Sequence, residues 1–320
     1  MRHSSSHTNA IKKPKKFSLK DWKEIFGRVR KQINHDHLLV VSGGIAFFFF
    51  LAIFPALIAT VSIYGLVVSP AEVQQQMSQI TAQLPEKVHI MISDILKNIA
   101  DKSGSTLSWS VFLGVLISLY SAKKGITALF EGINIAYNEM NERPFLKKNG
   151  LELLFTFGAI ITGILALIVV AVWPAIVEKL GLPAVLQAVI SWGRWILLAL
   201  IIVFSLGLIY KVAPDRRNPE FKWASPGSVV ATLLWIGISL LFSWYVDNFG
   251  SYDKTYGSFA TVIILMLWFL LTSFIILLGA EINSEMEHQT SKDSTIGQDK
   301  PMGQRGAYYA DRVAGGEKDD

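Results

Sequence analysis

The sequence predicts an all-α, polytopic integral membrane protein with six transmembrane helices, and three observations lead to this fold class. Hydrophobic residues make up 51% of the 320 residues and charged residues only 17%, whereas soluble domains carry about 25% charged residues. The apolar residues stand in long runs that do not alternate with polar ones, as is typical of helices in lipid hydrocarbon. The basic residues gather between alternate runs, as expected for loops on one side of a bilayer.

The first span is expected over residues 41–68, where 28 consecutive residues carry no charge. A helix of that length extends about 42 Å, enough to cross roughly 30 Å of hydrocarbon with some tilt. The run SGGIAFFFFLAIFPALIAT lies inside it, and its phenylalanines can face lipid. Gly43 and Gly44 would let another helix approach closely. Pro55 is tolerable because neighbouring helices can satisfy the carbonyl that it frees.

Five further apolar runs predict the remaining spans. The first of them is the weakest, because its 15 residues reach only about 22 Å and would need extension or local thinning of the bilayer. The last run is uncharged and ends at Glu281. Tryptophans lie near the ends of several runs, where aromatic belts form at the membrane interface. The five runs are at about 107–121, 153–173, 195–212, 226–249 and 257–280.

The distribution of basic residues predicts the orientation of these spans. With the N-terminus in the cytoplasm and six crossings, 24 of the 30 Lys and Arg residues fall in cytoplasmic segments. The positive-inside rule expects such a bias. If residues 107–121 did not cross, the basic residues of 123–148 would move outside and the bias would fall. Both termini are therefore expected in the cytoplasm.

Residues 1–37 are expected to form a basic cytoplasmic lead that touches the membrane surface. Trp22, Phe26 and Val29 share one side of a helical segment, and Lys and Arg stand opposite them. This pattern is typical of an amphipathic helix lying at the interface. The basic residues of the lead are expected to contact anionic lipid headgroups.

Two other segments outside the spans carry distinct patterns. Residues 69–106 form the largest expected extracytoplasmic loop, and apolar residues recur at helical spacing on both sides of Pro85. This spacing predicts an extracytoplasmic helical hairpin, which either packs on its own bundle or docks a partner protein or a lipid chain. Residues 285–320 are polar and glycine-rich, and they predict a disordered cytoplasmic tail. The spans between these segments form one membrane domain, residues 38–284.

The segment that follows the second run predicts a helix with one polar side. Ile133 and Tyr137 belong to its apolar stripe, whereas Glu131, Asn134 and Asn138 share the other side. Such a helix either lines a water-filled cavity beside the short span or lies flat on the inner surface of the membrane.

Soluble-type catalytic motifs are absent from the sequence. The chain has no cysteine, which excludes disulfides, thiolate metal sites and cysteine nucleophiles. His35, Asp36 and His37 could bind a metal, but no spaced ligand motif accompanies them, so a solvated polar junction is the favoured interpretation. No phosphate-binding loop, dinucleotide fingerprint or nucleophile elbow appears. We therefore expect no catalytic residues, no metal, no cofactor and no enzymatic activity.

Polar residues in and beside the spans are the remaining candidates for a site, because such residues are costly in lipid. Each charge alone is explained by an interfacial anchor or a local ion pair. As a set, charges at both mouths of the bundle with polar groups between them fit a transport path. The candidates are Asn134, Tyr137, Asn138, Asp215, Asp247, Tyr252, Tyr256 and Glu281.

The last third of the chain carries motifs that a generic apolar span would not reproduce. A Y-x-x-x-Y-G-S block is followed by Trp268 and then by L-G-A-E-I-N. Together with GGIAFFFFLAIFPALIATVSIYG and LYSAKKGITALFEGINIAYNE, these motifs resemble the YihY/BrkB family of bacterial inner-membrane proteins over residues 20–285. The older family label, ribonuclease BN, finds no support here, because no residues resemble a nuclease metal centre. The matching positions are Pro55, Gly125, Asn134, Asp215, Pro226, Gly227, Tyr252, Tyr256, Gly257, Trp268, Gly279, Glu281 and Asn283.

The resemblance implies a multi-pass protein of the bacterial cytoplasmic (inner) membrane, but it implies no defined molecular activity. It adds Asn283 to the polar candidates, and it marks Gly125, Pro226, Gly227, Gly257 and Gly279 as positions of close helix packing or kinks. We expect the protein to translocate a lipid, an amphiphile or a small solute. The alternatives are a scaffold that recruits an envelope protein through the hairpin and an intramembrane enzyme. The expected partners are the lipid bilayer, an envelope protein or a second copy of the chain, and not nucleic acid.

Overall fold

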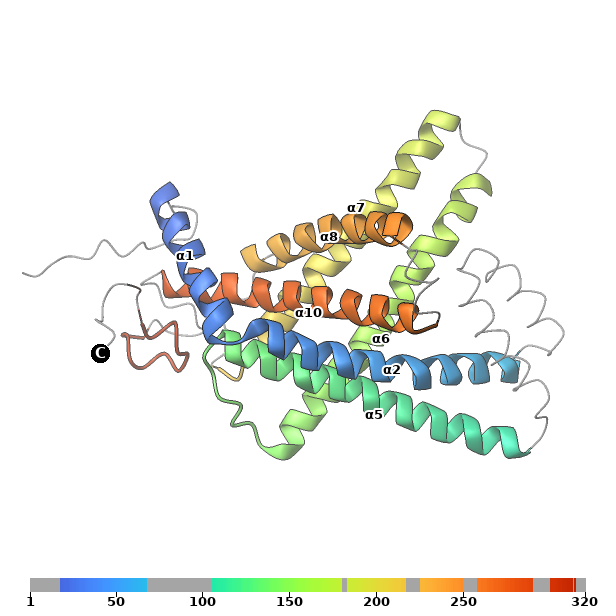
Figure 1. Ribbon diagram of the computed structural model, residues 1–320, viewed down its shortest axis with the longest axis horizontal. Helices are drawn as coiled ribbons and strands as arrows, with labels where there is room; N and C mark the ends of the chain where they lie inside the picture. Colours follow the sequence, from blue (N-terminus) through green and yellow to red (C-terminus); the bar gives the residue numbers. More distant parts are fainter. Residues whose placement is uncertain are drawn as a thin grey trace, which may run out of the picture. The chain divides into compact units, whose positions relative to one another are not determined.

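The computed structural model describes residues 18–67, 105–179, 183–216, 225–249, 258–289, 300–312 and 314, and side chains for most of them. These residues form helices and connectors and contain no strand, which confirms the all-α class. Figure 1 shows the helices, most of them long. They are α1 (Leu19–His35), α2 (Leu38–Val67), α5 (Ser105–Ala136), α6 (Phe145–Lys179), α7 (Ala184–Val212), α8 (Pro226–Phe249) and α10 (Ser258–His288).

Several helices are long and apolar enough to cross a bilayer, which confirms a polytopic membrane protein. Within the described residues there are four such stretches, at 112–136, 192–212, 226–246 and 262–288, and α1 with α2 makes a fifth if this bent pair counts as one span. α6 has 35 residues and a length of about 52 Å. The total of six crossings and the orientation of the termini stay predictions.

α5 differs most from its expected bounds. It runs unbroken over 32 residues, so the short run at 107–121 and the polar-sided segment after it form one helix. The buried Ile126, Phe130 and Ile133 show that the second part packs inside the protein and does not lie flat on a surface. Lys123 and Lys124 interrupt the apolar run, whereas the backbone hydrogen bonding continues to a left-handed Asn138 (φ 56°).

The end of α5 has a complete Schellman motif. The N–H of Asn138 donates to Ile135 O at 2.9 Å, and the N–H of Glu139 donates to Asn134 O at 2.9 Å. Asn is one of the few residues that tolerate the left-handed conformation required there. This turn directs the chain into the connector that leads to α6.

α1 packs against the protein as well as carrying an exposed apolar face. Ser18 and Asp21 form a capping box at its start, with the Ser18 N–H donating to Asp21 Oδ2 at 2.7 Å. Ile25 and Val29 are buried against Ile282 and Met286 of α10. The neighbouring side chain Phe26 is exposed, so one side of α1 contacts protein while the other is free to meet the membrane.

The chain bends by 62° between α1 and α2. Two residues, Asp36 and His37, make the turn, and His37 adopts a left-handed backbone (φ 48°). α2 then continues helical through Pro55 to Val67.

The described chain divides into two compact units. Unit 1 contains residues 1–43, 129–243 and 270–320, and unit 2 contains residues 44–128 and 244–269. In unit 2 the α2 and α5 segments lie side by side (Figure 1), and a Cβ placed on Gly125 would come within 2.5 Å of the Phe49 ring. In unit 1, α6 and α7 pack along each other, and Phe130 of α5 meets Phe155 of α6 edge to face at 5.2 Å.

Gly227 and Gly279 bring three helices of unit 1 together. A Cβ on Gly227 would clash with the carbonyl oxygen of Gly279, and a Cβ on Gly279 would clash with the hydroxyl of Tyr210. That hydroxyl donates to Ile276 O at 2.7 Å. The starting turn of α8, the end of α7 and α10 therefore approach through bare backbone. At Gly43 and Gly44, by contrast, an added Cβ would meet no atom of the described residues within 4 Å.

Large apolar side chains cover the outside of the helices. Trp192 is 73% exposed, and Leu240 and Leu241 are exposed to a similar degree. In water such a surface would be an aggregation hazard, whereas in a bilayer it meets hydrocarbon at no cost.

Several predictions fall outside what the structure describes. The hairpin at 69–106, Tyr252, Tyr256 and Gly257 lie outside the described residues, and the side chains of Pro55 and Asp247 are not described.

Candidate functional site

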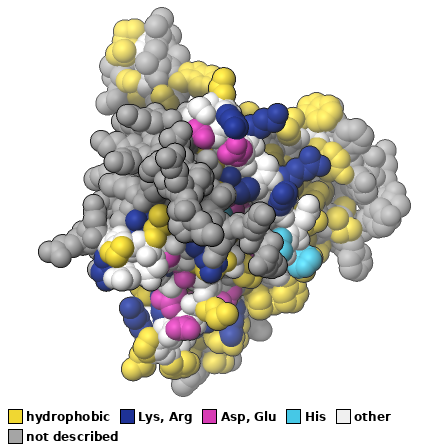
Figure 2. Space-filling model, turned by 90° about the vertical axis from the view of Figure 1, so that its left-hand side faces the viewer, with side chains coloured by type: hydrophobic (Ala, Val, Ile, Leu, Met, Phe, Trp, Pro, Cys, Tyr) yellow, Lys and Arg dark blue, Asp and Glu magenta, His cyan; other side chains and the backbone are white. Residues whose placement is uncertain are grey.

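Charged and polar side chains of unit 1 gather around the C-terminal part of α10 and the helix ends next to it; we call this region the polar layer. Figure 2 shows the face that carries acidic, basic and histidine side chains. Its parts come from distant places in the chain. They are residues 28–37 of α1 and the α1–α2 turn, 131–143 of α5 and its connector, 213–216 after α7, 225–228 at the start of α8, 279–289 of α10, and 300–312.

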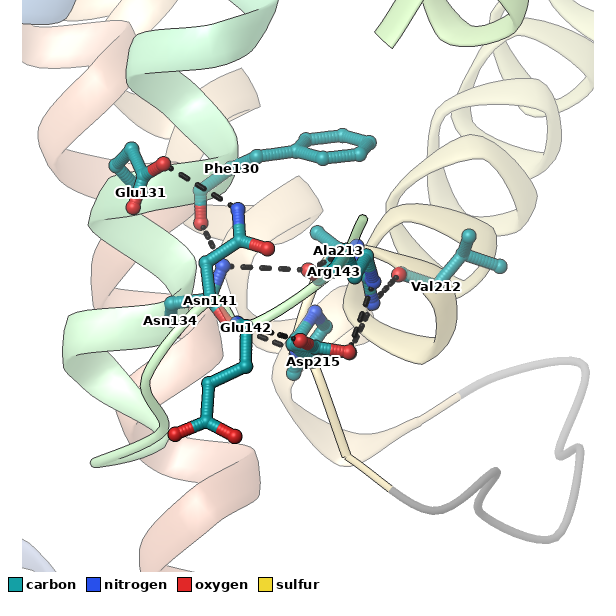
Figure 3. A network of polar contacts seen from close by, with 10 residues as sticks. Phe130, Glu131, Asn134, Asn141, Glu142, Arg143, Val212, Ala213 and Asp215 are labelled. Atoms are coloured by element: carbon teal, nitrogen blue, oxygen red, sulfur yellow. Dashed lines mark hydrogen bonds and ion pairs between the residues drawn. The ribbon is translucent and has the colours of Figure 1, made fainter. Parts of the chain in front are cut away.

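One part of the polar layer holds the end of α7 (Figure 3). Arg143 donates to three backbone carbonyls there, at 2.9 Å to Val212 O, 3.1 Å to Ala213 O and 2.6 Å to Pro214 O. Its Nε also pairs with Asp215 Oδ1 at 3.0 Å. The last carbonyls of a helix have no partner within the helix, and a guanidinium fork satisfies several of them at once.

Asn134 ties α5 to the same place. Its amide nitrogen donates to Phe130 O at 2.8 Å and reaches Ala213 O at 3.4 Å, while its oxygen accepts from the Asp215 N–H at 2.7 Å. Asp215 Oδ2 accepts the N–H of Glu142 at 2.8 Å. The polar groups of Asn134 and Asp215 are thus engaged with protein, and their geometry is that of a clamp between α5, the connector and α7.

Replacing Arg143 with lysine is expected to lower the free energy of unfolding by about 1–2 kcal/mol, because one ammonium cannot reach all the carbonyls that the fork satisfies. Thermal unfolding of the purified protein in detergent measures this. The same change at Arg30, which is exposed on α1, is the control and should leave the transition in place. Equal transitions for the two variants would show that Arg143 does not hold α7.

A buried ion pair lies next to the clamp. Arg216 and Glu287 pair directly, with side chains 6% and 8% exposed. The guanidinium carbon of Arg216 also lies 4.5 Å from the centre of the Tyr137 ring. Burial lowers the pKa of Arg216 but the Glu287 carboxylate raises it, and the net shift is upward. Arg216 therefore stays charged, and its pairing joins the end of α7 to α10.

Asn283 caps the beginning of α8 from a different helix. Its side-chain oxygen accepts the Gly227 N–H at 2.8 Å, and its amide nitrogen donates to Ser225 Oγ at 3.0 Å. Ser225 precedes Pro226, the first residue of α8, and its hydroxyl accepts the Ser228 N–H at 3.2 Å. Pro at the first helical position and Ser before it are the residues that favour a helix start.

Residues 300–312 fold onto the polar layer, where the sequence predicts a disordered tail. The Tyr309 hydroxyl accepts from Gln32 at 3.0 Å, and the Asn138 amide lies 3.5 Å from it. Burial raises the pKa of Tyr309 to about 12, so this hydroxyl keeps its proton. The Tyr308 N–H donates to Glu139 at 2.7 Å. Figure 1 shows this segment at the same end of unit 1 as α1, and α10 itself continues to His288.

Glu281 is a buried acid of the polar layer that pairs with no cation among the described residues. Its side chain is fully buried in α10, and neither carboxylate oxygen has a hydrogen-bond partner among the described residues. The group that it faces is another carboxyl, that of Asp36. Asp36 belongs to the α1–α2 turn, and its side chain is only 8% exposed. The His35–Asp36–His37 turn therefore differs from a wholly solvated junction, because its acid points inward.

The structure brings six of the predicted polar residues into the polar layer, and the side chains of the other three, Asp247, Tyr252 and Tyr256, lie outside what it describes. Asn138 lies next to Tyr309. Asn134 and Asp215 meet in the clamp, Tyr137 lies beside Asn283, and Glu281 stands near them on α10. Sequence reasoning did not select Asp36, Arg143, Arg216 or Glu287. Their contacts join distant parts of the chain, as Arg143 contacts Asp215 and Arg216 contacts Glu287. Only the helical spacing of Glu281 and Glu285, which places both acids on one side of a helix, signals that α10 has a polar side there. Among the described residues, no group of three or more His, Cys, Asp or Glu side chains is placed to hold a metal ion.

Comparison with known proteins places the chain in a family. A family model described as "Virulence factor BrkB" matches residues 29–303. The chain belongs to the BrkB family. The matched range covers the polar layer of this BrkB-family protein from Val29 of α1 to the first residues of the C-terminal segment.

Relatives of this BrkB-family chain cover most of its length. The ribonuclease-like protein YfkH of Bacillus subtilis is 29% identical over 267 residues, which are 82% of this chain and 93% of YfkH. A UPF0761 membrane protein of Alteromonas mediterranea is 25% identical over 276 residues, covering 82% and 88% of the two chains. Another from Tolumonas auensis is 26% identical over 274 residues, covering 80% and 83%. No solved structure matches the chain.

Proposed function

We propose that this BrkB-family protein translocates a lipid, an amphiphile or a small solute across the bacterial cytoplasmic membrane. The observation that carries the proposal is Glu281, an ionisable group that is buried in an apolar helix and pairs with no cation among the described residues. Such a group costs several kcal/mol in a membrane protein, and ionisable residues inside membrane helices commonly mark a substrate or ion pathway.

The surroundings of Glu281 support the proposal. The neighbouring charges of the polar layer are paired, as Arg216 is with Glu287 and Arg28 is with Glu285 at 2.5 Å. These pairs hold helix ends together, so they explain the fold without any substrate. Glu281 adds no such contact, and stability gives no reason for a carboxyl at this position.

Reconstitution in liposomes tests the proposal. We expect the purified protein to scramble a fluorescent phospholipid or to carry a small solute faster than empty vesicles do, and we expect Glu281→Gln to reduce that rate by at least about tenfold, a loss of about 1.4 kcal/mol in transition-state stabilisation. The control is Glu131→Gln, which removes a carboxylate paired with Lys148 at the surface and should leave the rate unchanged.

Rates equal to those of empty vesicles, across a panel of lipids and solutes, would refute translocation. If the protein were inactive in liposomes but bound an envelope protein, the result would favour the scaffold alternative, in which the chain recruits such a protein on the extracytoplasmic side.

A further inference from the structure

Glu281 and Asp36 form a pair of carboxyl groups that lack donors on their facing sides. Both oxygens of Glu281 and the Oδ2 of Asp36 have no hydrogen-bond partner among the described residues. Two carboxylates cannot hydrogen-bond each other, and their charges repel strongly where water is excluded. One proton on the pair removes that repulsion and supplies an O–H···O⁻ hydrogen bond, which is short and strong in such surroundings.

His35 connects this pair to the outside of the protein. Its Nδ1 lies 2.7 Å from Asp36 Oδ1, and its side chain is 74% exposed. Histidine is the side chain that takes up and releases protons near neutral pH. His35 thus contacts Asp36, and Asp36 faces Glu281, so that successive contacts connect solvent with the buried interior.

The other charged groups near the pair are already engaged. Glu285, one turn further along α10, pairs with Arg28 of α1 at 2.5 Å and contacts His288 at 3.4 Å. Tyr137 of α5 and Tyr309 of the C-terminal segment are also close enough to feel the charge of Glu281, but burial keeps both hydroxyls protonated. Arg28 and the His288 ring, at this end of α10, therefore both contact Glu285.

We propose that Asp36 and Glu281 form a proton-binding site, in which the two carboxyls share one proton and His35 exchanges it with water. In uptake, the His35 imidazolium passes its Nδ1 proton to Asp36. The imidazole becomes neutral, and the carboxyl pair goes from two negative charges to one. Release is the reverse of this step. A metal ion fits these groups less well, because Ca²⁺ for example takes six to eight oxygen ligands.

The proton site has a consequence for transport that rests on the proposed function: the proton is the ion that accompanies the translocated substrate. Protonation removes a charge at the contact between the α1–α2 turn and α10. The protein would thus carry different charge at this contact in the two halves of a transport cycle.

Infrared difference spectroscopy of the full-length protein in nanodiscs tests the site directly. We expect a protonated-carboxyl C=O band at neutral pH that disappears only at alkaline pH. The band should be lost in both Glu281→Gln and Asp36→Asn. Glu281→Gln is expected to fold, because its amide can donate to Asp36, and Glu281→Asp should keep a band at a shifted frequency. Persistence of the native band in both amide variants would overturn the proposal, as would a titration that shifts with sodium concentration.

The role of His35 has its own matched control. In His35→Asn the band should remain, but its appearance after a pH jump should slow on the order of 10²-fold. His37→Asn is the control, since His37 is exposed and asparagine accepts the left-handed backbone of that position. If the band appeared at equal rates in the two variants, His35 would not be the group that exchanges the proton with water.

Liposome flux under a pH gradient separates this proposal from the proposed function. A band without any flux would support the proton site and refute translocation. Flux that ignores the pH gradient would support translocation and refute coupling to the proton.

Discussion

Replacing Arg216 with methionine is expected to lower the free energy of unfolding by about 3–5 kcal/mol, because the change leaves Glu287 charged and buried without its partner. Both side chains are almost fully covered, so water cannot take over the role of the guanidinium. Methionine fills much of the lost volume, so the cost arises from charge and not from a cavity. Thermal unfolding in detergent, followed by circular dichroism, measures the effect.

A double-mutant cycle identifies the source of that cost. Arg216→Met combined with Glu287→Leu should be more stable than Arg216→Met alone, because the orphaned charge is then gone. Lys148→Met is the control for an exposed pair, since Lys148 and Glu131 are 32% and 44% exposed; it should cost at most about 1 kcal/mol. If Lys148→Met were as damaging as Arg216→Met, burial of the ion pair would not explain the loss.

Replacing Gly227 with alanine is expected to destabilise the protein by about 3 kcal/mol, at the upper end of the cost of overpacking. The new Cβ would clash with the carbonyl oxygen of Gly279 and come within 2.7 Å of the Asn283 side chain. A carbonyl in a helix cannot rotate away, so α8 and α10 must separate. Their separation would also pull Asn283 from the N-terminus of α8, where it accepts the Gly227 N–H.

Gly237 provides the matched control on the same helix. An added Cβ there would meet no atom of the described residues within 4 Å, so Gly237→Ala should stabilise α8 by up to about 1 kcal/mol through helix propensity. The two alanine variants should therefore shift the unfolding temperature in opposite directions. Shifts in the same direction would show that close packing at Gly227 is not what holds α8 against α10.

The sequence predicts some helix bounds well and others poorly, and the difference has a local cause. α8 was expected at 226–249 and is found at Pro226–Phe249, because Ser225 and Pro226 mark a helix start within the chain itself. The second span was expected to end at residue 121 with a separate polar-sided helix after it, whereas α5 runs unbroken to Ala136. Hydrophobicity reports where an apolar run ends, and the charges of Lys123 and Lys124 end this run well before the helix ends. The residue that marks the end of α5 is Asn138, with its left-handed backbone. In the sequence it is one of several polar residues, and nothing distinguishes it from the others.

The candidate site shows the same division. Glu281, Asn134 and Asp215 stand out in the sequence because polar residues are rare beside membrane spans. Their roles diverge in the structure. Asp215 accepts hydrogen bonds from Arg143 and a backbone N–H, and Asn134 bonds to backbone groups, whereas Glu281 faces a second acid. Nothing local to any of the three distinguishes these environments. Asp215 contacts Arg143, Asn134 and Glu142, each at least 70 residues away in the chain. Glu281 faces Asp36 in the α1–α2 turn, near the other end of the chain.

The sequence by itself determined that this protein is a multi-pass membrane protein of helices, because the preference of each apolar run for hydrocarbon depends on its own composition. Only the tertiary structure decided which polar residues are satisfied and which is not. Hydrogen bonds and ion pairs are short-range and directional, so they depend on the bend at His37, the turn at Asn138 and the glycine contact of α8 with α10. Those features bring Asp36 to Glu281 and Arg216 to Glu287.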